Sequence, residues 1–281
     1  MEKLLLIDGS NLLFQMFFGM PARIVNQSGK AVHGTMGFLG ALLKIIRMTN
    51  PTHIAVLFDG ERGNERTALN ADYKANRVDY GQVPEDECPF TQLPDIYKAL
   101  DFLKIPHAET SVCETDDWIA GYALTYGKEM KIVISSFDSD YFQLLSENVS
   151  ILRYRGVKTA ICTPKTLWER YGIHPSQYAD FKSLVGDSAD NIKGAYGVGP
   201  KTAACLLQEF STLENLLNCA ERIQRPAVKT AIFEEQERLK TNYRIIKLSA
   251  GAELPFPLEK LQYTEILCGT GEVLRGIGLL P

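Results

Sequence analysis

The chain has 281 residues, of which 45% are hydrophobic and 23% charged. This composition excludes disordered, collagen-like and disulfide-scaffold proteins, and the length suits one large domain or two modest ones. An excess of 34 Asp and Glu over 30 Lys and Arg gives a net charge of −4, which at first argues against a nucleic-acid-binding protein.

The N-terminal apolar stretch ends at Asp8, which makes it too short for a signal peptide. No apolar run approaches the roughly 20 residues of a membrane span. The six cysteines are scattered without a C-x-x-C pair, so we expect reduced thiols, with Cys162 and Cys205 in the core. These features predict a cytoplasmic protein without a membrane partner.

Short apolar runs at residues 4–7, 53–58 and 131–134 predict three buried strands. Between them, apolar residues at helical spacing predict helices at 34–48 and 93–103. Strands that alternate with helices predict a mostly parallel sheet, and continuously apolar strands predict that helices flank both of its faces. The predicted fold class is therefore α/β.

Each predicted strand is followed by aspartate: Asp8 after the first, Asp59 after the second, and Asp138 with Asp140 after the third. One such aspartate can equally cap the following helix. Ligands bind at the carboxyl ends of parallel strands, and carboxylates from three neighbouring strands would repel one another there. A raised pKa or a bound cation relieves such repulsion.

Further acids form two short clusters. Glu114, Asp116 and Asp117 open a predicted helix, and Asp187 and Asp190 are spaced i, i+3. Helix capping explains one acid in a first turn, but it does not require three within four residues.

Nine carboxylates thus form the candidate metal site, without an accompanying cluster of His or Cys ligands. They are Asp8, Asp59, Glu114, Asp116, Asp117, Asp138, Asp140, Asp187 and Asp190. Oxygen ligands favour Mg²⁺, with Mn²⁺ as a substitute, over zinc. Two such ions suit in-line attack of water on a phosphodiester.

A glycine-rich segment spans residues 194–203. It matches neither the Rossmann fingerprint nor a Walker A loop, because Pro200 stands where a glycine must precede Lys and Thr. We expect a helix, a tight glycine turn and a second helix that starts near Lys201 and offers backbone amides to a phosphate. A plain turn between helices is the alternative. The predicted DNA-binding residues here are Gly197, Val198, Gly199, Lys201 and Thr202.

The polar segment 61–92 has no clear periodicity and is long for a loop without a function. Basic and aromatic side chains interleave in it, as in segments that follow a single strand and stack on its bases, although an ordinary solvated loop is the alternative. These side chains are Arg62, Arg66, Tyr73, Lys74, Arg77 and Tyr80. A later helical stretch at 223–248 is also basic, which suits either a flank for duplex DNA or a solvated face.

Together these features resemble the 5′-nuclease family, which comprises flap endonucleases and the 5′→3′ exonuclease domain of bacterial DNA polymerase I. The resemblance extends in order from Leu4 to about Leu248. It is carried by the segments 6–11, 58–59, 73–77, 114–117, 138–140, 186–192 and 197–203.

The resemblance implies a PIN-like nuclease core at residues 1–172, with a helical arch at about 61–92. It implies a helix–three-turn–helix DNA-binding subdomain at 173–281. The implied activity is divalent-metal-dependent hydrolysis of phosphodiester bonds at 5′ ends and flaps, by a 5′→3′ exonuclease and flap endonuclease of DNA replication, repair and Okazaki-fragment processing. A non-catalytic branched-DNA-binding protein of the same fold and a PIN-type RNase are the alternatives.

The resemblance also assigns roles. One metal group corresponds to Asp8, Asp59, Glu114, Asp116 and Asp138, and a second, divided only approximately from it, to Asp117, Asp140, Asp187 and Asp190. Lys74 and Arg77, next to Tyr73, correspond to catalytic arch residues at the scissile phosphate. The hairpin carbonyls correspond to a K⁺ site. The implied partners are DNA with a 5′ flap, nick or 5′ end and RNA–DNA primer junctions, bound by a monomer.

The chain departs from the family pattern at three places: Phe14-Gln15 replaces a common arginine, Ser139 replaces a lysine, and Lys193 replaces a proline. None of these departures removes a predicted metal ligand, which favours an active enzyme over a binding module. Outside the nine predicted ligands, 25 acidic residues remain against 30 basic ones. The acidic balance is therefore concentrated in one predicted pocket, and the rest of the chain suits nucleic-acid binding.

Overall fold

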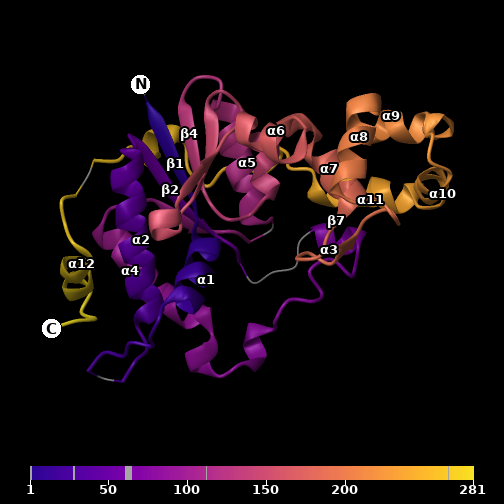
Figure 1. Cartoon of the computed structure of the whole chain (residues 1–281). Coiled ribbons are helices and arrows are strands. Elements are labelled where there is room, and N and C mark those ends of the chain that lie inside the picture. Colours follow the sequence, from indigo (N-terminus) through magenta and orange to yellow (C-terminus); the bar gives the residue numbers. More distant parts are fainter. Residues whose placement is uncertain (1, 28, 61–64, 112, 265) are drawn as a thin grey trace.

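The computed structural model describes residues 2–27, 29–60, 65–111, 113–264 and 266–281. Within this part of the chain, no helix combines the length and the apolar character that spanning a membrane requires. The structure consists of a central sheet with helices on both faces, beside a group of mostly short helices from the second half of the chain (Figure 1).

The central sheet has six strands in the order β3-β2-β1-β4-β5-β6, and only the β5–β6 pair is antiparallel. Its strands are β1 (Lys3–Asp8), β2 (His53–Phe58), β3 (His107–Glu109), β4 (Lys131–Ser135), β5 (Val149–Arg153) and β6 (Ala160–Cys162). The predicted mostly parallel sheet is confirmed.

β1 lies at the middle of the sheet, between β2 and β4. Leu4 is in register with His53 on one side and with Ile132 on the other. The carboxyl ends of the three strands that precede the predicted aspartates therefore lie side by side.

Alternate residues of β1 serve two cores, because successive side chains of a strand point to opposite faces. Leu5 and Ile7 pack on one face and Leu4 and Leu6 on the other, and all four are fully buried. The first face is covered by α1 (Gly9–Gly19), α2 (His33–Thr49), α4 (Leu93–Phe102) and α12 (Thr270–Gly276). The second is covered by α5 (Thr115–Tyr126) and by residues from the second half of the chain.

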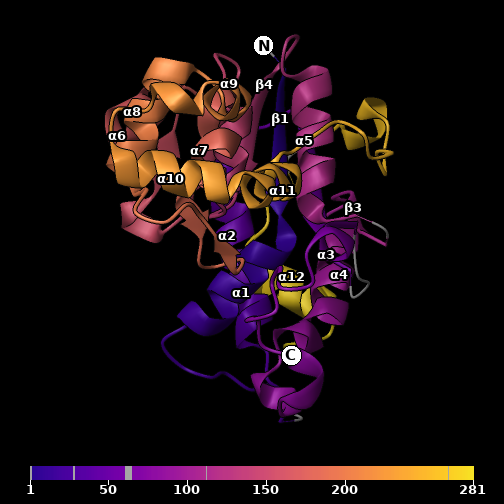
Figure 2. The ribbon, with the colours of Figure 1, turned by 90° about the vertical axis from the view of Figure 1, so that its right-hand side faces the viewer.

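Residues 164–246 form the helical part (mostly orange in Figures 1 and 2). Its elements are α6 (Pro164–Tyr171), α7 (Tyr178–Val185), β7 (Gly186–Asp187), β8 (Ile192–Lys193), α8 (Pro200–Phe210), α9 (Leu213–Asn218), α10 (Pro226–Glu234) and α11 (Gln236–Ile246). The glycine turn thus follows a two-stranded hairpin, β7–β8, and not a helix directly. The stretch 223–248 is two helices that meet at Glu235, whose backbone leaves the helical conformation.

Between β2 and α4 the described chain contains the short helix α3 (Glu65–Leu69) and three 3₁₀ turns at Tyr80–Gln82, Glu85–Glu87 and Pro89–Gln92. The predicted basic residue Arg62 lies outside the described residues. One prediction about the core is wrong: Cys205 is exposed, because it lies on the outer face of α8, whose neighbouring residues Ala204 and Leu206 turn inward. Cys162 is buried as expected.

Candidate metal centre and nucleic-acid interface

Asp8 ends β1 and starts α1, so it lies at the carboxyl edge of the sheet. Its carboxylate accepts hydrogen bonds from the backbone N–H of Asn11 at 2.9 Å and from the hydroxyl of Ser136 at 2.8 Å. The side chain is buried, and its burial, followed by the charge of Asp59, raises its pKa to about 7. A carboxylate with this pKa is a group that gains from a bound cation.

Three more acids stand around Asp8. Burial and then the charge of Asp138 raise the pKa of Asp116 well above its usual range. The buried Tyr141 hydroxyl donates to Asp116 at 2.6 Å and lies 3.4 Å from Asp8. Asp59, at the end of β2, accepts from the N–H of Thr115 at 2.9 Å and so ties the start of α5 to the sheet. The predicted convergence of strand-end acids is therefore present.

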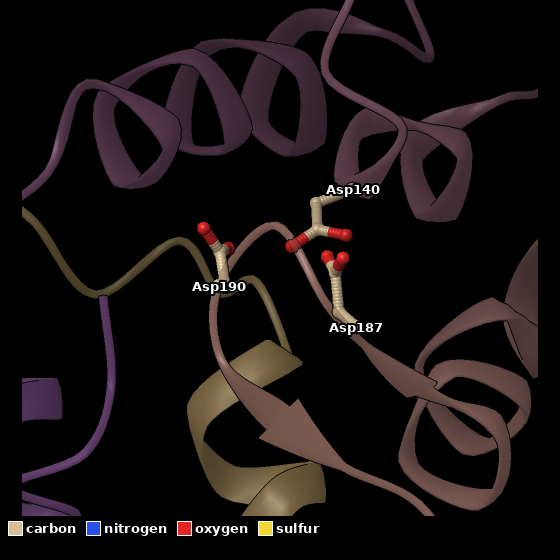
Figure 3. Close-up of side chains that lie close together, drawn as sticks. All are labelled: Asp140, Asp187 and Asp190. Atoms are coloured by element: carbon tan, nitrogen blue, oxygen red, sulfur yellow. The ribbon is translucent and has the colours of Figure 1, made fainter. Parts of the chain in front are cut away.

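Asp140, Asp187 and Asp190 form a second group, in which one carboxylate oxygen from each lies within 4.8 Å of the others (Figure 3). Asp140 follows β4, whereas Asp187 and Asp190 belong to the hairpin β7–β8 and its turn. Burial raises the pKa of Asp140 to about 7 although the ammonium of Lys182 opposes this shift. Lys182, on α7, forms ion pairs with both Asp140 and Asp187.

Glu114 and Asp117 lie at the N-terminus of α5 and share one cation, the buried guanidinium of Arg66. Arg66 Nη2 is 2.7 Å from Asp117 Oδ1, and the Lys74 ammonium is 2.7 Å from Glu114 Oε1. Burial would raise the pKa of Glu114, but Lys74 and Arg66 outweigh it and leave the pKa lowered. Arg66 therefore joins an acid predicted for the first metal group, Glu114, to one predicted for the second, Asp117, and their division between the two groups stays a prediction.

Basic residues of the segment 65–92 reach into the acidic site. Arg77 Nη2 is 2.7 Å from Asp190 Oδ1, and the backbone N–H of Lys74 donates to the carbonyl of Asp190 at 3.0 Å. Tyr73 is 5% exposed, and its hydroxyl donates to Glu114 at 3.1 Å. A ring buried in this way is not available to a base, so the structure does not support the stacking prediction for Tyr73.

The donor set fits a hard divalent cation. The nine predicted ligands are all carboxylates. Some lie at the edge of the sheet around Asp8, Glu114 and Asp117 lie beside the basic side chains of Arg66 and Lys74, and the others surround Asp140. Mg²⁺ and Mn²⁺ bind through oxygen, whereas zinc prefers nitrogen and sulfur. The arrangement suits hydrolysis of the P–O bond of a phosphodiester.

Only one of the two glycines expected to form the turn has a backbone conformation that favours glycine. Gly197 has φ of +71°, in the left-handed region, whereas Gly199 has φ of −87° and precedes α8 as its N-cap. Val198 between them is buried and anchors the turn in the core. Lys201 is exposed, and the hydroxyl of Thr202 lies 3.5 Å from Arg225, so that three polar groups stand at the start of α8.

Two residues of the site were missed from sequence. Lys182 lies in α7, five residues before Asp187, and Tyr141 directly follows Asp140; neither belongs to the motifs from which the site was predicted. The available signal for Lys182 was a lysine among apolar residues shortly before an acidic motif. Such a lysine is expected to pair with an acid, since lysine is almost never buried unless it is paired.

Comparison with known proteins links the chain to a family. Residues 3–172 match the model of the 5′-3′ exonuclease N-terminal resolvase-like domain, and residues 173–267 match the 5′-3′ exonuclease C-terminal SAM fold. A 5′-3′ exonuclease of Aquifex aeolicus is 31% identical over 264 residues, which cover 93% of this chain and 87% of that protein. The thermostable DNA polymerase I of Thermus thermophilus is 33% identical over 264 residues, which cover 94% of this chain but only 30% of the polymerase.

Solved structures share the fold. The T5 5′-exonuclease with bound zinc ions superposes with a TM-score of 0.73 at 22% identity and covers 87% of this chain and 89% of its own. The T5 D15 flap endonuclease in a pseudo-enzyme–product complex with DNA and metal ions also gives a TM-score of 0.73, at 21% identity, over 98% of this chain and 99% of its own.

Proposed function

The chain belongs to the 5′-3′ exonuclease family, and from this membership we propose that it is a divalent-metal-dependent nuclease that hydrolyses DNA at 5′ ends and 5′ flaps. One observation carries the proposal: three neighbouring strands and the hairpin β7–β8 bring their carboxylates to the same side of the molecule, where burial raises the pKa of Asp8 and Asp140 to about 7. Acids held at such a cost suit a cation site.

Two groups of carboxylates would each hold one divalent ion. The first is Asp8, Asp59, Glu114, Asp116 and Asp138, and the second is Asp117, Asp140, Asp187 and Asp190. We expect Mg²⁺ in both, with Mn²⁺ as a substitute. Bound ions of this kind activate water and stabilise the leaving oxygen of a phosphodiester.

Lys74 and Arg77 would act on the substrate. Their side chains already reach Glu114 and Asp190 at 2.7 Å, so they stand at the carboxylates that would hold the ions. A phosphate brought to this place meets two cations, which orient it and neutralise charge that develops on its oxygens. Glu114 would also position Lys74 and Arg66, Asp117 would position Arg66, and Asp190 would position Arg77.

The turn Gly197–Thr202 would bind duplex DNA through backbone amides and Lys201, without reading sequence. We further propose K⁺ at its carbonyls. The division into a core at 1–172 and a DNA-binding part at 173–281 is part of this proposal, and so are the substrates: DNA with a 5′ flap, nick or 5′ end, and RNA–DNA primer junctions of replication and repair.

A labelled double-flap DNA tests this function. Wild type with Mg²⁺ is expected to release the 5′ flap, and EDTA or Asp138→Asn is expected to abolish release, because the carboxylate charge at the edge of the sheet is lost. Lys165→Gln, a change at an exposed ion pair with Glu169 outside the proposed DNA-binding part, is the matched control and should cut normally. Binding of the flap by wild type without cleavage in Mg²⁺ would favour the non-catalytic alternative.

An all-RNA flap of the same sequence separates a 5′ DNA nuclease from a PIN-type RNase. The expected result is faster cleavage of the DNA flap, because the glycine turn and the start of α8 suit duplex DNA. Preference for the RNA flap would reverse the assignment.

A further inference from the structure

A polar cavity of about 250 Å³ lies where the hairpin β7–β8, helix α11 and the turn after α3 meet. Figure 2 shows α3 and α11 beside each other in this region, and the two helices are in contact. The residues that line the cavity are Asn70, Asp72, Asn191, Lys193, Arg238 and Asn242. None of them belongs to the predicted metal ligands or to the glycine turn.

Lys193 gives the cavity an unengaged positive charge. Its side chain is exposed, and no carboxylate within the described part of the chain lies within 4.0 Å of its ammonium. In contrast, Arg66, Lys74 and Arg77 are each already paired with an acid. Lys193 can therefore meet an anion without first breaking an ion pair.

The frame around Lys193 is fixed by hydrogen bonds. The buried amide of Asn242 donates to the carbonyl of Lys193 at 2.8 Å and to that of Ser183 at 3.2 Å. Arg238 donates to the carbonyl of Gly194 at 2.9 Å and pairs with Glu235 at 2.6 Å, which leaves its other N–H groups for a further acceptor. The walls of the cavity are thus held before any ligand arrives.

The chemistry of the cavity suits a singly charged oxyanion. Lys193 supplies the free positive charge, because Arg238 is paired with Glu235 and offers only its remaining N–H groups. Both N–H groups of Asn242 are used, so further donors come from the amides of Asn70 and Asn191, and Asp72 is the one acid among the lining residues. The cavity is next to the acidic group of Figure 3, because Asn191 directly follows Asp190. A strand whose reacting phosphate lies at the carboxylates would have its neighbouring phosphates within reach of this cavity.

We propose that this cavity binds a backbone phosphate of the substrate strand close to the scissile one, with Lys193 as its main cation. The proposal rests on the proposed function as a DNA nuclease. Lys193 would be a positioning residue that adds affinity and holds the strand in register, and it would take no part in bond cleavage.

DNA binding measured by fluorescence anisotropy tests the proposal, with all proteins carrying Asp138→Asn so that the flap DNA stays intact. We expect Lys193→Gln to raise Kd about 3–10-fold and to reduce the slope of log K against log salt by about one, as the loss of one phosphate contact does. Asp72→Asn should lower Kd, because it removes the repelling charge. Lys44→Gln, at an exposed lysine on α2, should leave both quantities unchanged.

A scan of single neutral methylphosphonate linkages along the substrate strand locates the contact. One linkage near the scissile position should weaken binding by the protein with Lys193 and have no effect on the Lys193→Gln variant. Equal sensitivity of both proteins at every linkage, or an unchanged Kd and salt slope, would overturn the phosphate site while leaving the nuclease assignment intact. Failure of the protein with Lys193 to bind flap DNA at all would overturn both.

Discussion

Single carboxylates at the edge of the sheet are unfavourable to the folded protein without a cation. Asp8 is 5% exposed, and its pKa of about 7 lies well above the ordinary value of 3.8. The same holds for its neighbour Asp116, whose pKa is also raised by burial. These buried acids lower the stability of the metal-free fold and are arranged to bind a cation, as is common at functional sites.

Asp8 therefore links stability to pH. Between pH 4 and 7 the folded protein keeps the proton that the unfolded chain releases, so stability falls as pH rises, by up to about 4 kcal/mol for this group. We expect Asp8→Asn to raise the Tm of the metal-free protein by several degrees at pH 8 and to leave it unchanged at pH 4. Calorimetry in EDTA measures this difference.

The control for Asp8→Asn is the same measurement in Mg²⁺. Wild type should then gain more in Tm than the variant, because only wild type keeps the full ligand charge. A variant that is less stable than wild type at pH 8 in EDTA would show that the Asp8 carboxylate stabilises the metal-free fold.

At the scale of elements, the glycine turn is a short connection with one position in the left-handed region. Gly197 adopts φ of +71°, which residues with a Cβ rarely adopt, whereas Gly199 lies in an ordinary region. A Cβ at either position would meet no atom within 4 Å. The two glycines therefore differ in backbone conformation and not in available space.

We expect Gly197→Ala to destabilise the protein by about 1–2 kcal/mol, since the left-handed conformation costs an alanine that much. Gly199→Ala should cost less, because its backbone conformation suits any residue and only the weaker N-cap of alanine counts against it. Chemical denaturation of the two variants measures the free energy of unfolding. The same two variants also test DNA binding. A loss of affinity in Gly197→Ala alone would indicate that the backbone conformation of the turn matters for binding. Equal stability of both variants would contradict the role given to Gly197.

At the scale of the whole molecule, ion pairs join the segment 65–92 to both parts of the chain. Arg66 pairs with Asp117 at the start of α5, and Arg77 pairs with Asp190 in the turn of the hairpin β7–β8. The amide of Asn76 also donates to the carbonyl of Ser188 at 3.0 Å. The sheet and the helical part are therefore connected through a segment with little regular structure.

We expect Arg77→Gln to make the segment 65–92 more sensitive to proteolysis, by about two- to five-fold in cleavage rate, because weakening a partly exposed ion pair costs up to about 1 kcal/mol. Limited proteolysis with mass spectrometry identifies the cut sites. Lys165→Gln should match wild type. Faster cutting throughout the chain in Arg77→Gln would mean that the whole fold, and not this segment, has been loosened.

Sequence predicted the parts of this molecule that depend on local pattern. Apolar runs identified β1, β2 and β4, and parallel pairing then brought Asp8, Asp59 and the acids after β4 together. The pairing of Lys182 with Asp140 and of Arg66 with Asp117 could not be predicted, because these contacts depend on how distant segments pack. The exposure of Cys205 was missed for a related reason, since one residue type does not reveal which face of α8 is outward.

The order of the carboxylates along the chain has a consequence for biosynthesis. β1 pairs with β4 across about 128 residues, and the acidic group in Figure 3 is completed only by Asp190. A nascent chain emerges from its N-terminus onward, and contacts between distant segments form late. The acidic group is therefore incomplete until Asp190 has left the ribosome, so we expect no metal-dependent cleavage from nascent chains that end before this residue.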